Sequence, residues 1–158
     1  MNTLIYTRLA VRMVKYENKE MVLDVVKNSA VMVIEGNAQG ILELDKVGRR
    51  ILTEFPEVAL QYKAACQQGL VDVGQALYIE AWGFEFIFLI NQYYRVGEKV
   101  QDTSDKIVFN TIKCIDKLKQ KMPNKKFISG ILNRHSATWQ KIAGHLAASG
   151  LSWTVYRE

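Results

Sequence analysis

The sequence predicts an α/β fold in which helices cover both faces of a mixed central sheet. Short apolar runs rich in β-branched and aromatic residues alternate along the chain with segments of helical periodicity. The 158 residues are 49% hydrophobic and 23% charged, which suits one domain with a sizeable core. No repeat, low-complexity stretch or linker divides the sequence, so residues 1–158 are expected to form a single domain.

Seven segments have the composition of strands. They are residues 3–9, 12–16, 31–34, 76–82, 84–91, 127–132 and 153–156. We expect the first two at one edge of the sheet. The run 31–34 is wholly apolar and is bounded by polar and glycine residues, which is typical of a buried strand. Gly83 separates residues 76–82 from 84–91 and suits a tight connection between two strands.

Two short helices are expected between residues 48 and 69. Ile51, Leu52 and Phe55 give the first helix one apolar face. Pro56 suits the first turn of the second helix, because its missing N–H costs nothing there. The apolar stripe of this helix has the spacing i, i+4, i+7 and i+8, in Val58, Tyr62, Ala65 and Cys66. Gly69 fits the left-handed position that often follows a helix.

Two longer helices are expected further along the chain. Thr103 or Ser104 can cap the first of them, and Pro123 is expected to end it. Ser136 is expected to cap the second, which ends before Gly150.

Residues 48–76 combine several of these features in a fixed order. A Phe-Pro-Glu junction at 55–57 is followed by Tyr-Lys-x-Ala-Cys at 62–66, then by Gly69, Leu70 and Gly74. This order resembles the macro domain family of ADP-ribose-binding modules, and it is most similar to the ADP-ribosyl glycohydrolase branch. The resemblance implies a three-layer α/β/α macro-domain-like fold with a mixed central sheet, in agreement with the alternation of elements.

The loop after the first buried strand carries part of the family's ligand motif. In the family this loop reads Asn-x-x-Gly-Val-Met-Gly-x-Gly, because glycines let the backbone approach a diphosphate closely. Residues 37–48 here read NAQGILELDKVG. The resemblance implies that Asn37, Gly40 and Ile41 bind the ligand. Glu43 and Asp45 stand near the later glycines and would place two carboxylates beside a diphosphate, so we expect the loop to depart from a normal phosphate cradle.

Three further residues are candidate ligand contacts. Glu20 stands where the family has an acid that reads the adenine amino group; the alternative is a surface glutamate. Asn133 and Ser136 belong to a second loop, where ILNRHSATW replaces the family's Gly-Cys-Gly-rich run. Ser136 has the alternative role of a helix cap.

His135 and Arg134, in the same loop, are the candidate catalytic residues. A histidine can act as acid, base or phosphate partner near neutral pH, and an arginine can hold a phosphate with two hydrogen bonds. The alternatives are a solvated loop histidine and a surface arginine. The family's acid is replaced by Thr138. Its lysine position falls on Arg95, which stays protonated, so the resemblance does not carry over the covalent mechanism.

Charge and composition limit the partners. The net charge is +5, and lysines gather between residues 113 and 126, where they also complement a helix dipole. Nucleic acid is therefore an open but not favoured partner. No apolar run approaches the ~20 residues of a membrane span, and we expect a cytoplasmic protein without membrane contact. Cys66 and Cys114 lack metal-ligand spacing and are expected to be reduced core residues. No metal or cofactor is expected, and the oligomeric state is open.

Three functions fit the sequence. The first is a non-catalytic binding module for ADP-ribose or a related nucleotide, with a degenerate active site. The second is a protein-interaction or structural domain that has lost the ligand. The third is a rewired ADP-ribose-processing hydrolase, a phosphatase or glycohydrolase that uses His135 and Arg134. A degenerate domain of this size also fits a phage or mobile-element protein.

Overall fold

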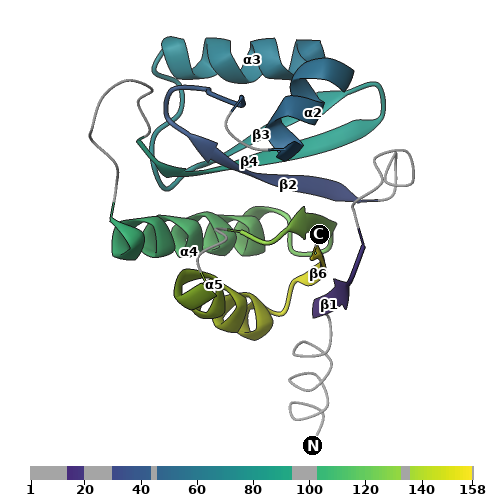
Figure 1. Ribbon diagram of the computed structural model, residues 1–158, viewed down its shortest axis with the longest axis vertical. Coiled ribbons are helices and arrows are strands. Elements are labelled where there is room, and N and C mark those ends of the chain that lie inside the picture. The colour runs from purple at the N-terminus through teal and green to yellow at the C-terminus, as the bar shows by residue number, and fades with distance from the viewer. Residues whose placement is uncertain (1–13, 20–29, 44–45, 94–102, 133–135, 158) are drawn as a thin grey trace, which may run out of the picture.

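The computed structural model describes residues 14–19, 30–43, 46–93, 103–132 and 136–157, which form a six-stranded mixed sheet with helices on both faces (Figure 1). The strand order is β1-β6-β5-β2-β4-β3, and all neighbours are parallel except β3 and β4. The strands are β1 (Val14–Glu17), β2 (Val31–Asn37), β3 (Ala76–Ala81), β4 (Phe84–Gln92), β5 (Lys126–Gly130) and β6 (Ser152–Tyr156). The helices are α2 (Lys46–Glu54), α3 (Pro56–Gln67), α4 (Ser104–Lys121) and α5 (Ser136–Ser149). The predicted fold class is confirmed.

Two hydrophobic cores lie on opposite faces of the sheet. Helices α2 and α3 cover one face, and α4 and α5 cover the other (Figure 1). Successive residues of a strand point to opposite faces, so Met32 and Ile34 enter the first core while Val31 and Val33 enter the second. A strand buried on both faces needs apolar residues at successive positions, which explains the unbroken apolar run at residues 31–34 of β2.

The helix pair lies where the sequence predicts it. Phe55 precedes Pro56 and packs edge-on against Phe84 and Phe86, with ring centroids 4.9 Å apart in each pair. Gly69, with φ +69°, ends α3. Its N–H donates to the carbonyl of Cys66, and the N–H of Leu70 donates to that of Ala65, which is the Schellman arrangement.

Several predicted boundaries need correction. β2 continues to Asn37, three residues beyond the predicted end, because Gly36 and Asn37 still pair with β4. β5 ends at Gly130 instead of residue 132, although Leu132 remains buried in the core beyond the ladder. Thr103 caps α4 by accepting from the N–H of Lys106, and Ser104 is the first helical residue.

The remaining elements agree with the sequence to within a few residues. β1 overlaps the predicted strand at 12–16, whereas the predicted strand at 3–9 lies outside the described residues. α5 begins at Ser136 itself, so this residue opens the helix instead of preceding it. Within the described part of the chain, no helix is long and apolar enough to cross a bilayer.

The connection between β3 and β4 is a two-residue turn made by Trp82 and Gly83. Ala81 pairs with Phe84, and both turn residues have positive φ, 53° for Trp82 and 82° for Gly83. The predicted strand 76–82 was therefore one residue too long. Hairpin turns of this kind favour asparagine at the first position, whereas Trp82 is 59% exposed and occupies a strained backbone region.

Replacing Trp82 with asparagine is expected to raise the free energy of unfolding by about 1 kcal/mol, because asparagine tolerates the left-handed region. Chemical denaturation monitored by circular dichroism measures the change. Trp82→Ala is the control, since alanine keeps the strain and is expected to give no such gain. Equal stability of the asparagine and alanine variants would contradict this explanation.

Candidate functional site

The parallel strands end at one edge of the sheet, and this carboxyl edge is where open α/β folds bind ligands. The loop after β2 lies there and leads into α2. Residues 38–43 of this loop are described, and the N–H of Ala38 donates to the carbonyl of Gln92 at the end of β4. The backbone therefore ties this loop to the neighbouring strand.

Asn37 organises the loop with its own side chain. Its Oδ1 accepts from the N–H groups of Gln39 and Ile41, each at 3.1 Å, and its Nδ2 donates to the carbonyl of Ile41 at 2.8 Å. Asn37 is 5% exposed. The structure thus brings together Asn37, Gly40 and Ile41, and their contact with a ligand stays a prediction. However, the polar groups of Asn37 shape the loop, so its role is to position the backbone.

Tyr62 of α3 anchors the same residue from beneath the loop. Its hydroxyl accepts from the N–H of Asn37 and donates to the carbonyl of Asn37, both at 2.7 Å, and Tyr62 is fully buried. A Cβ atom at Gly36 would lie 3.0 Å from this hydroxyl, so the glycine leaves room for it. From its place in the apolar helical stripe, sequence analysis assigned Tyr62 to the core and missed this second role. The available signal was that a buried tyrosine hydroxyl needs a partner.

Gly40 allows the loop to lie directly against α3. Its φ is +72°, and a Cβ atom at this position would lie 2.7 Å from the Cα of Lys63. Both facts favour glycine, since the backbone is left-handed and the neighbouring atom is also backbone. The thiol of Cys66 lies 3.7 Å from the carbonyl oxygen of Asn37 on the same side. Burial raises the pKa of Cys66 to about 11, so the thiol is neutral and is not an activated nucleophile.

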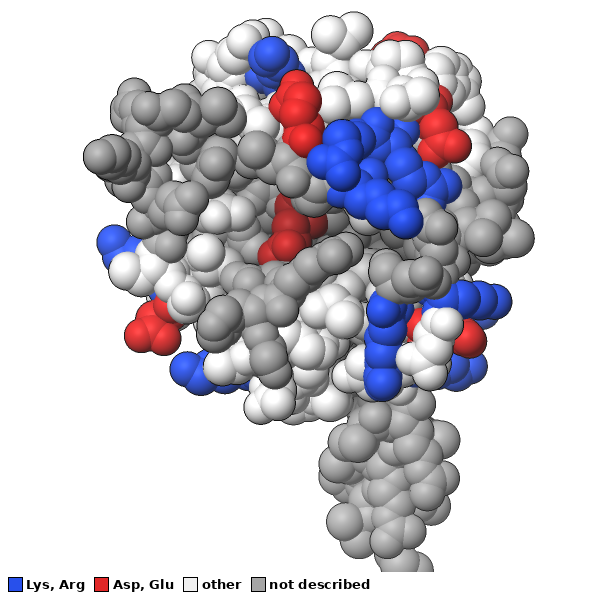
Figure 2. Space-filling view, in the orientation of Figure 1, with Lys and Arg blue, Asp and Glu red and all other residues white. Residues whose placement is uncertain are grey.

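Of the two carboxylates expected beside a diphosphate, the structure describes that of Glu43. The side chain of Glu43 turns back on the chain, where its Oε2 accepts from the N–H of Leu42 at 3.1 Å. Asp45 lies outside the described residues. Arg49 of α2 reaches the same segment, and its Nη1 donates to the carbonyl of Glu43 at 3.2 Å. Figure 2 shows basic atoms gathered on this face of the molecule near α2, which carries Lys46, Arg49 and Arg50.

A buried polar cluster lies on the α4 side of the sheet, near the same edge. Nδ2 of Asn91 donates to Glu35 and to the hydroxyl of Thr111, each at 3.1 Å, and Asn110 donates to the carbonyl of Asn91 at 3.4 Å. Asn91 is fully buried, and its Oδ1 has no hydrogen-bond partner in the described part of the chain. Sequence analysis used Asn91 to align the family motif but did not predict this cluster, because Glu35 and Asn91 are 56 residues apart.

Most of the other predicted site residues lie outside the described part of the chain. Glu20, Asn133, Arg134 and His135 lie outside the described residues, as does Arg95. Ser136 opens α5. Thr138, which stands at the position of the family's acid, is 3% exposed. Across the described ranges, no group of three or more His, Cys, Asp or Glu residues is arranged to hold a metal ion. Both cysteines are free; Cys114 is buried, as predicted, whereas Cys66 is half-buried against the first core.

Comparisons with known proteins relate this geometry to one fold. No family model and no curated protein sequence matches the chain. The macrodomain of Mycobacterium tuberculosis DarG is 13% identical over 92% of this chain and 97% of its own, with a TM-score of 0.69. The macrodomain of Thermus aquaticus DarG is 15% identical over 92% of this chain and 98% of its own, with a TM-score of 0.70.

A third similar structure contains a ligand. Thermosipho africanus DarTG in complex with ADP-ribose is 10% identical over 91% of this chain and 42% of its own, with a TM-score of 0.69. At these identities the likeness shows the fold, and it extends over nearly the whole of the sequence. The chain therefore has the macrodomain fold.

Proposed function

We propose that this protein binds ADP-ribose or a related nucleotide at the carboxyl edge of its sheet and does not hydrolyse it. The observation that carries the proposal is the loop after β2. Asn37, Gly40 and Tyr62 hold its backbone in a defined shape at the edge where this fold class binds ligands. The likeness to a macrodomain-fold structure in complex with ADP-ribose supports the choice of ligand.

The charges of α2 favour an anion at this edge. Its first five residues include Lys46, Arg49 and Arg50, its first turn has no acidic residue, and Glu54 stands at its end. The N-terminus of a helix carries the positive end of its dipole, so it repels these cations. Each such cation lowers the stability of the helix by about 0.3 to 1 kcal/mol. A phosphate near the N-terminus of α2 would be attracted both by these cations and by the helix dipole. Basic residues are usually disfavoured in the first turn of a helix, and such departures from local preference are expected at functional sites.

Several residues argue against hydrolysis. A buried threonine, Thr138, replaces the family's acid, and a threonine hydroxyl is not acidic enough to act as a general acid. The two thiols are also poor nucleophiles, because burial raises the pKa of Cys66 to about 11 and of Cys114 to about 12. These residues support binding without turnover.

Calorimetric titration with ADP-ribose is expected to give binding at one site. Arg49→Gln should weaken this binding about fivefold, because a charge-assisted contact at an exposed site contributes about 1 kcal/mol. Lys119→Gln on the last turn of α4 removes the same charge and is expected to leave the affinity unchanged. The absence of both heat and a melting shift at millimolar ADP-ribose would refute the proposal and leave a protein-interaction domain as the alternative.

Incubation with an ADP-ribosylated protein is expected to release no ADP-ribose. Chromatographic detection of released nucleotide makes the test independent of binding. Release that disappears in His135→Ala would contradict the non-catalytic proposal and support the rewired hydrolase instead.

A further inference from the structure

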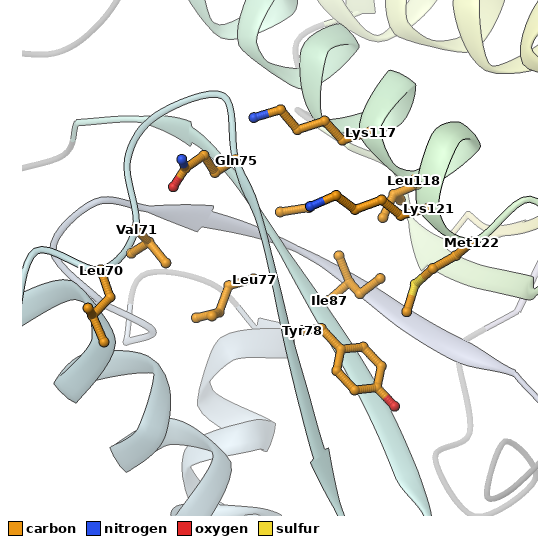
Figure 3. Close-up of a pocket in the computed structure, with 11 residues that line it drawn as sticks. Leu70, Val71, Gln75, Leu77, Tyr78, Ile87, Lys117, Leu118, Lys121 and Met122 are labelled. Atoms are coloured by element: carbon orange, nitrogen blue, oxygen red, sulfur yellow. The ribbon is translucent and has the colours of Figure 1, made fainter.

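A cavity lies beside the edge strand β3. Its volume is about 350 Å³, and it is bounded by β3, β4, the segment after α3 and the last turns of α4 (Figure 3). None of its lining residues belongs to the loop 37–43 or to α2. Pockets for small molecules in proteins begin at about 300 Å³, so this cavity has room for one small organic molecule.

The floor and one wall of the cavity are apolar. Ile87 of β4 and Met122 after α4 line it on the α4 side of the sheet, whereas Leu77 of β3 and Leu70 line it on the α3 side. Leu70 is 68% exposed, which leaves apolar surface at the mouth of the cavity in contact with solvent. A methionine adapts its shape to different ligands, because its unbranched side chain is flexible.

Two lysines give the cavity its charge. Lys117 and Lys121 lie one turn apart on α4, and Figure 3 shows both side chains extending from α4 toward β3. Neither ammonium has a carboxylate partner among the described residues. Glu85 of β4, which bonds to the lining residue Tyr78, accepts from the Tyr78 hydroxyl at 2.7 Å and from Lys125 at 3.0 Å.

We propose that this cavity binds a small organic anion with an apolar body, such as the carboxylate of a medium-chain fatty acid. The carboxylate lies between Lys117 and Lys121, and the hydrocarbon chain lies against Tyr78 and Met122 on the same face of the sheet. The two ammonium groups supply charge-assisted hydrogen bonds, and the floor supplies apolar contact. The site is separate from the proposed nucleotide site and does not depend on it.

Decanoate, kept below its micellar concentration, is the probe for calorimetric titration of the whole chain. The expected result is saturable binding at one site, with decanol at least about tenfold weaker because it lacks the charge. Lys117→Gln/Lys121→Gln is expected to weaken decanoate binding about tenfold or more. The matched control is Lys106→Gln/Lys119→Gln, which removes two exposed charges from the same helix outside the cavity and should bind as the natural protein does.

Leu70→Asp provides a second variant that does not endanger the fold, because this side chain is mostly exposed. A carboxylate at the mouth is expected to weaken decanoate binding about tenfold by repulsion and lost apolar contact. Equal affinity for decanol and decanoate, or unchanged decanoate binding in the Lys117→Gln/Lys121→Gln variant, would overturn the proposal. Displacement of decanoate by ADP-ribose would also overturn it, since the two sites would then be one.

Discussion

Replacing Gly40 with alanine is expected to lower the free energy of unfolding by about 3 kcal/mol. The left-handed backbone at φ +72° disfavours any residue with a Cβ atom, which costs about 1 to 2 kcal/mol. The added atom would also lie 2.7 Å from the Cα of Lys63. Backbone atoms cannot yield as a flexible side chain does, so overpacking adds about 1 to 3 kcal/mol. Denaturant unfolding monitored by circular dichroism measures the total change in the free energy of unfolding from these two effects.

Gly69 offers a matched control for this substitution. Its φ of +69° is nearly the same, but a Cβ atom there would meet nothing within 4 Å. Gly69→Ala should therefore show the conformational cost alone, about 1 kcal/mol. Equal losses in the two variants would mean that the close approach of the loop to α3 has no energetic importance.

Replacing Tyr62 with phenylalanine is expected to lower the free energy of unfolding by about 2 kcal/mol. Phenylalanine keeps the ring, which stacks on Phe88 with centroids 4.2 Å apart, so apolar burial is nearly unchanged. What is lost is the hydroxyl that joins the N–H and the carbonyl of Asn37. Leaving a buried polar backbone group unsatisfied costs about 1 to 3 kcal/mol.

Tyr78→Phe is the control for the loss of a tyrosine hydroxyl. This hydroxyl bonds to Glu85 at the exposed surface, where water can replace it, so a change within about 0.5 kcal/mol is expected. Because the Tyr62 hydroxyl also fixes the loop, Tyr62→Phe should weaken ADP-ribose binding as well. Unchanged stability and unchanged affinity in Tyr62→Phe would contradict the anchoring role.

Local patterns were sufficient to predict the layers of the fold. The continuous apolar run 31–34 predicted a strand buried on both faces, and the structure confirms it. The Phe-Pro-Glu junction and Gly69 predicted the helix pair, because a proline and a left-handed glycine act on the residues next to them. Trp82 misled the prediction, since its aromatic propensity for strands yielded to the geometry of a two-residue turn.

The candidate site could be predicted less well, because distant segments form it. Asn37 was singled out as a ligand contact, which stays a prediction, whereas its hydrogen bonds within the loop depend on backbone groups whose positions no spacing rule gives. The contact between Asn37 and Tyr62 spans 25 residues, and that between Glu35 and Asn91 spans 56. The second contact follows from the strand order, which places β4 beside β2, and the first from the packing of α3 against the loop.

Titration of the ¹⁵N-labelled protein with ADP-ribose, followed by NMR, tests the proposed function most directly. The amide signals expected to shift are those of residues 38–43 and of the first turn of α2, because the ligand should lie against their N–H groups. Signals of the residues that line the cavity beside β3 should stay in place. The absence of any shift at millimolar ADP-ribose, or shifts confined to β3 and the end of α4, would contradict nucleotide binding at the carboxyl edge.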